Sequence, residues 1–176
     1  MKEYFELKIS DLQNAVKWTL SYVEKSLSVY EKYQINDSRA KEAILGAIDF
    51  YESGKRTNVL RKIAMSAYKA SRETEIIQAS YAANAASLIA AIAYTHPFRD
   101  SKQSRHILGP IVYSAMCIEI ENGDEALGNG IIKEAIMSVN DDIISLINEY
   151  PRQEKRGKRI DELFYYLDHE IAKGNR

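Results

Sequence analysis

Apolar residues recur every three or four positions along most of the chain, which is the period of an amphipathic α-helix. The first such stretch follows Ser10-Asp11, a pair suited to cap a helix, and continues to about Tyr33. The second follows Asn36-Asp37-Ser38 and stops at Ser53-Gly54, because glycine favours a helix terminus. A third stretch follows Thr57-Asn58, and its inward positions include three alanines: Ala64, Ala67 and Ala70.

An alanine-rich stretch from about Glu75 to Tyr94 predicts a central helix. Five of its alanines are spaced alternately four and three residues apart and therefore form one narrow stripe: Ala79, Ala83, Ala86, Ala90 and Ala93. Small side chains let a neighbouring backbone approach closely, and the third helix has a matching small face. We expect these two helices to pack antiparallel across a short turn near residues 71–74.

The C-terminal half continues the helical pattern. A fifth helix follows the polar loop from Pro97 to Gln103 and ends at Asn122-Gly123, and Asp124 is suited to cap the helix after it. Residues 124–149 fit either one helix or two, since Gly128, Gly130 and an Asn-Asp-Asp run at 140–142 interrupt the pattern. A last helix is predicted from about Arg159 to Ala172, and strand-like alternation is confined to the segment from Tyr4 to Ile9. The expected fold is all-α, a single domain over residues 1–176, built as a bundle or as stacked hairpins of about six to eight helices.

Composition narrows the class of protein. Apolar residues make up 45% and charged residues 28% of the chain, which is typical of a globular domain and excludes a disordered one. The net charge of -1 gives no general attraction to nucleic acid or to an anionic membrane. The single Cys117 has no partner for a disulfide within the chain, and the first residues lack the apolar core of a signal peptide. We therefore expect a cytoplasmic protein.

The charge-free segment from Ile76 to Thr95 raises the alternative of a membrane span, since it is long enough to cross a bilayer. Alanine dominates this segment, and Gln78, Asn84 and several serines recur in it. Buried amides are costly in lipid, and alanine offsets little of that cost. A helix buried within a protein bundle is the favoured interpretation.

Candidate catalytic groups are few. His96 and His106 flank one loop, and a metal site there would need further ligands such as Asp100 or Glu119. The histidine spacing of zinc hydrolases and the glutamate-histidine pattern of di-iron bundles are both missing. Cys117 lies in an apolar helical pattern that suits an inert core thiol. We predict a non-enzymatic protein without cofactor or metal, and a small metalloprotein or enzyme using the His96–His106 loop is a less favoured alternative.

Two surface features allow more than one interpretation. A basic run from Arg152 to Arg159 resembles a nucleic-acid patch, but it lacks interleaved aromatic residues and is better explained as a solvated linker. The chain also has 12 tyrosines, many at positions where a helix meets its neighbour. Tyrosines at the edge of the core are the simpler explanation, whereas an exposed group would mark an interface with a partner or with a second copy of the chain.

Residues from about Ala15 to Glu119 resemble the Imm5-like immunity protein family, an all-helical group associated with polymorphic toxin systems. The resemblance rests on the order and spacing of short signatures rather than on any single motif, and residues 122–176 are not covered by it. The signatures are Asp37-Ser38-Arg39, Lys41-Glu42-Ala43-Ile44, Phe50-Tyr51 with Gly54, Arg61 to Arg72, Thr95-His96, His106-Ile107-Leu108-Gly109 and Tyr113-Ser114-Ala115.

The resemblance implies a protein that binds and neutralises a toxin through a preformed helical surface, without a cofactor. The positions that match the recurring signatures are Asp37, Arg39, Arg61, Arg72, His96, His106 and Tyr113. These residues have an alternative structural explanation, in which Asp37 caps its helix and the arginines pair with carboxylates across helix junctions. Self-association as a homodimer is the other non-enzymatic hypothesis.

Overall fold

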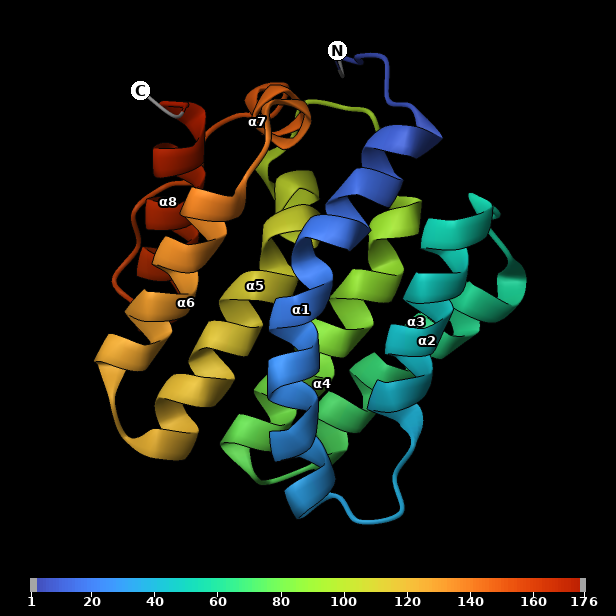
Figure 1. The fold of residues 1–176 in the computed structure, drawn as a ribbon, viewed down its shortest axis with the longest axis vertical. Coiled ribbons are helices and arrows are strands. Elements are labelled where there is room, and N and C mark those ends of the chain that lie inside the picture. Colours follow the sequence, from blue (N-terminus) through green and yellow to red (C-terminus); the bar gives the residue numbers. More distant parts are fainter. Residues whose placement is uncertain (1–2, 175–176) are drawn as a thin grey trace.

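The computed structural model describes residues 3–174 as a bundle of eight α-helices with one short 3-10 turn (Figure 1). The helices are α1 (Ile9–Tyr33), α2 (Arg39–Ser53), α3 (Asn58–Glu73), α4 (Ile77–Ala91), α5 (Ser101–Asn122), α6 (Glu125–Ser138), α7 (Asp141–Asn148) and α8 (Arg159–Ala172), and the turn η1 (Ile92–Tyr94) follows α4. Within residues 3–174 there is no strand. The all-α prediction is confirmed.

The alanine-rich helix α4 lies at the centre of the bundle, where α1, α2, α3 and α5 pack around it (Figure 1). The five alanines of its predicted stripe are each at most 1% exposed, and Ala82, Ala85 and Ile89 on other sides of the helix are also buried. A helix surrounded in this way has few positions in contact with water, which explains why its sequence contains no charge. Among the described residues, no helix is both long and apolar enough to cross a membrane.

Three hydroxyl groups of the α4 region join it to α3. Ser80 donates a hydrogen bond to the carbonyl of Ser71 at 2.7 Å, and Ser87 donates to the carbonyl of Ala64 at 2.8 Å. The hydroxyl of Tyr94 donates to the carbonyl of Thr57. The donors advance along the chain in steps of seven while their acceptors recede by seven, so the two helices are antiparallel, as predicted.

The line of contact on α4 differs in one respect from the expectation. The hydrogen bonds to the backbone of α3 come from Ser80, Ser87 and Tyr94, so the side of α4 that includes these residues faces α3. The alanine stripe begins one residue earlier and is therefore turned about 100° around the helix, into the bundle. The inward small face of α3, with Ala64, Ala67 and Ala70, is buried as predicted.

On the other side of the bundle, α5, α6 and α8 pack together, and α1 runs beside them. Ser26 and Ser114 lie 3.2 Å apart between α1 and α5, and the hydroxyl of Tyr33 donates to Glu121 at 2.9 Å. Both pairs are separated by the same number of residues, so α1 and α5 are parallel. The indole of Trp18 donates to the carbonyl of Ala135 and thereby links α1 to α6.

Residues 124–149 form two helices, α6 and α7, with the break at Val139–Asn140, where the side chain of Asn140 accepts from the backbone of Ile143. Gly128 and Gly130 do not break α6. Gly128 instead allows close approach to α5, because a Cβ atom built on it would lie 2.3 Å from a carboxylate oxygen of Glu119.

The remaining boundaries differ only slightly from the predictions. Helix α1 begins at Ile9, so the predicted cap Ser10-Asp11 lies inside its first turn. The carboxylate of Asp11 accepts from the backbone N–H of Lys8 at 2.8 Å. Thr57 and Asp124 cap α3 and α6 as expected. The Tyr4–Ile9 segment forms only an isolated bridge between Tyr4 and Phe98.

The expectation of a solvated linker at residues 152–159 is wrong for the two arginines at its ends. Arg152 donates to the carbonyls of Ile147 and Tyr150 and lies 3.1 Å from the fully buried carboxylate of Asp168. Arg159 pairs with Glu119 at 2.8 Å. The lysines and the arginine between them remain exposed. Sequence reasoning missed these pairs because their acidic partners lie in distant helices.

Candidate protein-binding face

The seven residues suggested by the sequence fall into three groups in space. Asp37, Arg39 and Arg72 lie at the end of the bundle formed by the α1–α2 and α3–α4 connections (Figure 1). Arg61, His96 and His106 belong to segments at the opposite end, and Tyr113 lies midway along α5. The structure therefore does not gather them into one site.

Asp37 and Arg39 form an ion cluster that joins two loops. Arg39 lies 2.6 Å from a carboxylate oxygen of Asp37 and 2.7 Å from one of Glu73 at the end of α3. Asp37 also accepts from the backbone of Arg39 at 3.1 Å and so satisfies the first N–H of α2, one residue before the N-cap position at Ser38. The hydrogen bonds from Arg39 lower the pKa of Asp37 to about 2. The geometry fits the structural explanation for these two residues: they fix the end of α3.

The two histidines lie near each other but do not form a metal site with the acids considered above. His106 is largely buried, and burial together with the charge of His96 lowers its pKa. Asp100 accepts from the backbone of Lys102 at 2.8 Å, and Glu119 is paired with Arg159. No group of three or more metal-binding side chains occurs in the described part of the chain.

Cys117 is fully buried, and burial raises the pKa of its thiol to about 12, so it lacks the thiolate character that a nucleophile needs.

The outer side of α3 presents an exposed line of large side chains. Arg61, Met65, Tyr68 and Arg72 are spaced four, three and four residues apart, so they form one stripe along the helix. Met65 is 67% exposed and Tyr68 is 52% exposed, although both are large and apolar enough to be costly in water. The fold uses neither side chain for its core.

A second line on α4 lies on the same side of the layer. Tyr81 and Leu88 each come one residue after a serine that faces α3, and Ile77 and Asn84 continue this line one turn away. In α3, Met65 and Arg72 likewise each come one residue after a position that faces α4, namely Ala64 and Ser71. Because the helices are antiparallel, these equal offsets turn the two lines toward the same side. We call the combined surface of Arg61, Met65, Tyr68 and Arg72 with Ile77, Tyr81 and Leu88 the outer face.

Tyr113 of α5 extends the outer face at its edge. Its ring lies 5.7 Å from that of Tyr81 and 6.2 Å from that of Phe164 in α8. Burial raises the pKa of Tyr113, and the neighbouring hydroxyls of Tyr81 and Tyr68 add to this rise. Ring contacts thus link α4, α5 and α8. Phe164 is 1% exposed, so Tyr81 and Tyr113 are the members of this group that can extend the outer face, and aromatic rings are favoured anchors of protein interfaces.

The outer face includes Arg61 and Arg72 of the predicted set and has Tyr113 at its edge, but sequence reasoning missed Met65 and Ile77. The four-three-four spacing of Arg61, Met65, Tyr68 and Arg72 was the available signal. It was overlooked because an apolar residue in a helix is usually assigned to the core, and only the packing shows which side is covered.

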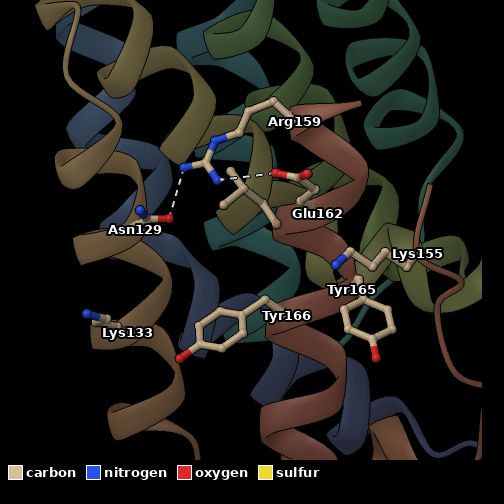
Figure 2. Close-up of a pocket in the computed structure, with 8 residues that line it drawn as sticks. Asn129, Lys133, Lys155, Arg159, Glu162, Tyr165 and Tyr166 are labelled. Atoms are coloured by element: carbon tan, nitrogen blue, oxygen red, sulfur yellow. Dashed lines mark hydrogen bonds and ion pairs between the residues drawn. The ribbon is translucent and has the colours of Figure 1, made fainter. Parts of the chain in front are cut away.

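A separate pocket of about 480 Å³ lies between α6 and α8 (Figure 2). Three positive side chains and two tyrosines line it, together with Asn129, Glu162 and Leu163. The positive residues are Lys133, Lys155 and Arg159, and the tyrosines are Tyr165 and Tyr166. None of these residues belongs to the set predicted from sequence. The pocket has different chemistry from the outer face.

Comparison with known proteins gives one match. The family model described as "Imm-5 like putative immunity protein" matches residues 6–139. This range extends the resemblance at both ends, taking in the whole of α1 and of α6, and leaves α7 and α8 outside. Among the curated proteins and the solved structures, none matches the chain. Since the matched range is most of the chain, the protein belongs to the Imm-5 like putative immunity protein family.

Proposed function

We propose that this protein neutralises a toxin by binding it through the outer face, without catalysis and without a cofactor. Membership of an immunity protein family supports a toxin as the partner. The observation that carries the choice of surface is the exposure of Met65 and Tyr68 between Arg61 and Arg72 on α3, with the exposed Ile77 on α4. Exposed apolar and aromatic side chains surrounded by charged ones are typical of a protein interface.

The charges of the outer face suit an acidic partner. Arg61 and Arg72 of this face are exposed, as are Lys62 and Lys69 beside it on α3, and within residues 3–174 Lys69 alone of these four has an acidic partner, Glu73 at 3.5 Å. The remaining cations are available to a second protein. We therefore infer that the toxin presents carboxylates around an apolar centre, which would speed association and set the orientation of the complex.

The outer face is held rigid before any partner binds. One end of α3 is fixed by the Arg39–Glu73 pair and by Gln34, which donates to Thr74 at 2.7 Å. The other end is fixed by the hydroxyl of Tyr94, which donates to the carbonyl of Thr57. A preformed surface loses little conformational entropy on association, and this favours tight binding from a modest contact area.

Self-association through the same face is the competing hypothesis. A two-fold contact would bring the α3 cations of one copy close to those of the other, and like charges at an interface oppose association. The charge of the face therefore favours an acidic partner over a second copy of the chain.

The experiment is co-expression with a toxin encoded beside the gene, followed by binding measurements on the purified proteins. The wild-type chain is expected to restore growth and bind the toxin, whereas Met65→Asp should reduce affinity by at least about tenfold, because it places a charge in the apolar centre. Met137→Asp is the matched control, since Met137 is 81% exposed on α6, away from the outer face.

Equal melting temperatures for the two variants would show that folding is unaffected. Failure of the wild-type chain to bind or rescue would overturn the proposed function. Rescue by both variants, with unchanged affinity, would instead overturn only the choice of surface.

A further inference from the structure

Arg105 of α5 lies at the same edge of the outer face as Tyr113. Its guanidinium is 4.3 Å from the centroid of the Phe164 ring, and that ring lies 6.2 Å from the ring of Tyr113. The charge of Arg105 also reaches Tyr113, since it opposes the rise that burial causes in the pKa of this tyrosine. The side chain of Arg105 is 32% exposed. A partly exposed cation therefore lies beside the aromatic edge of the outer face.

Three side chains fix the guanidinium of Arg105. Its Nη2 atom donates to the carboxylate of Asp161 at 2.7 Å, and its Nε atom donates to the side-chain oxygen of Gln153 at 2.9 Å. The ring of Phe164 packs against it as a cation–π partner. Gln153 is itself anchored, because its amide nitrogen donates to the carbonyl of Ser101 at 2.7 Å. A guanidinium held on several sides loses little conformational entropy when it binds a further group.

Arg105 keeps donors that the fold does not use. A guanidinium has five N–H groups. Within residues 3–174 the bonds of Arg105 involve Nε and Nη2, and its Nη1 atom makes no hydrogen bond. Two N–H groups on Nη1 are thus left for water or for a second protein, and hydrogen bonds from a charged donor are among the stronger ones.

The residues that hold Arg105 lie outside the part of the chain that matches the family model. The match covers residues 6–139 and so includes Arg105, whereas Gln153, Asp161 and Phe164 all follow it. The matched part of the chain supplies the cation, and the C-terminal segment that ends in α8 fixes its position.

We propose that Arg105 is a specificity-determining residue of the outer face: its Nη1 donates to an oxygen of the toxin, and Asp161 and Gln153 are positioning residues for it. The accepting oxygen belongs to a carboxylate or to a carbonyl, since a guanidinium binds both. This inference rests on the proposed binding of a toxin by the outer face. It adds that the choice of toxin depends on the C-terminal segment.

Affinity of the full-length chain for the toxin encoded beside the gene tests the role of Arg105. Arg105→Gln should weaken binding at least about tenfold, because a charge-assisted contact is lost. Arg159→Gln is the matched control, since it breaks another ion pair between α5 and α8, that of Arg159 with Glu119 at 2.8 Å. Arg159 faces α6, where it donates to Asn129 (Figure 2), so its loss should change the affinity by less than about threefold.

Substitutions of Asp161 separate positioning from stability. Asp161→Ala should weaken toxin binding in the wild-type chain but not in the Arg105→Gln chain, because it acts through Arg105. Asp161→Asn, which keeps an oxygen acceptor for Nη2, should retain most of the affinity. A merely structural role of Asp161 predicts the same loss of affinity in both chains and would overturn its assignment as a positioning residue.

Ionic strength identifies the accepting oxygen. If it belongs to a carboxylate, the loss of affinity caused by Arg105→Gln should shrink in high salt, because salt screens charge pairs at an exposed edge. If it belongs to a carbonyl, the loss should stay nearly constant.

Unchanged affinity of Arg105→Gln, in a chain whose binding Met65→Asp still weakens, would overturn this inference and leave the proposed function in place. Equal losses for Arg105→Gln and Arg159→Gln would overturn it too, since the effect would then come from a loosened α8. Failure of the wild-type chain to bind the toxin would overturn both.

Discussion

The two sides of the α3–α4 layer have opposite characters. The inner side has small residues, mainly alanine, which are almost fully buried. The outer side has arginine, methionine, tyrosine and isoleucine, several of them more than half exposed. The same two helices thus hold the bundle together with one side and leave the other side free.

This difference separates stability from recognition. Close packing on the inner side leaves no room for larger side chains, so substitutions there should change the free energy of unfolding. The outer side contributes little to the core, so substitutions there should leave folding intact and alter only association. The predictions below test this separation, in order of decreasing effect on stability.

The largest effect is expected for Ala86→Leu on the inner side of α4. Ala86 is 1% exposed, and the extra atoms would force its neighbours apart at a cost of about 1–3 kcal/mol in unfolding free energy. Asn84→Leu, on the outer line of the same helix, is the matched control and should cost less than about 0.5 kcal/mol. Equal destabilisation in chemical denaturation would contradict the distinction between the two sides.

Arg39→Ala should destabilise the fold by about 1–2 kcal/mol, because it leaves Asp37 and Glu73 without their shared cation. Arg72→Ala is the control, since the side chain of Arg72 makes no hydrogen bond or ion pair within residues 3–174. This substitution should change the free energy of unfolding by less than about 0.5 kcal/mol. A comparable loss in both variants would mean that the cluster does not fix the end of α3.

Acid sharpens the test of this cluster. The folded-state pKa of Asp37, about 2, is lower than its value of 3.8 in a model compound, so the unfolded state binds a proton first as pH falls. The stabilisation from this carboxylate is present above about pH 4 and is lost between about pH 4 and 2. Arg39→Ala should remove most of that acid-dependent step in a series of denaturation curves.

His106 predicts a smaller effect at a milder pH. Burial and the nearby His96 lower its pKa in the folded state, so the unfolded state takes up a proton first below about pH 6.5. Stability should therefore decline as pH falls from about 6.5 towards the folded-state pKa of His106. His106→Gln should flatten this decline in thermal melts between pH 7.5 and 5, and a decline as steep as in the wild-type chain would contradict the role of His106.

Tyr68→Ala should have the smallest effect on stability, within about 0.5 kcal/mol, because half of the side chain is already in water. Its affinity for the toxin should nevertheless fall at least about tenfold if the outer face is the binding surface. A melting temperature that drops by many degrees would place Tyr68 in the core instead and would weaken the comparison between the two sides.

The sequence was a good guide to the local structure. Caps at Thr57 and Asp124 and the stop at Gly54 follow from short-range chemistry, so they appear where they were predicted. The family resemblance was confirmed and extended, and the antiparallel pairing of α3 with α4 was correct. Gly128 was misread as a possible helix break, because only the neighbouring Glu119 reveals its role as a contact point.

The candidate site was predicted less well. Arg61, Arg72 and Tyr113 were found because each belongs to a signature of the family. The exposed Met65 of α3 and Ile77 of α4 were not found. Helical spacing identifies which residues share a side, yet an apolar stripe can face either the core or water.

What the sequence by itself determined is the succession of helices and the central place of the charge-free α4, because propensity, capping and the absence of charge act over one or two turns. Only the tertiary structure decided which polar groups meet, as in the Arg39–Glu73 and Arg159–Glu119 pairs, whose partners lie 34 and 40 residues apart. It also decided that α3 keeps one side uncovered. Both depend on which helices become neighbours, and many helix arrangements satisfy the same local pattern.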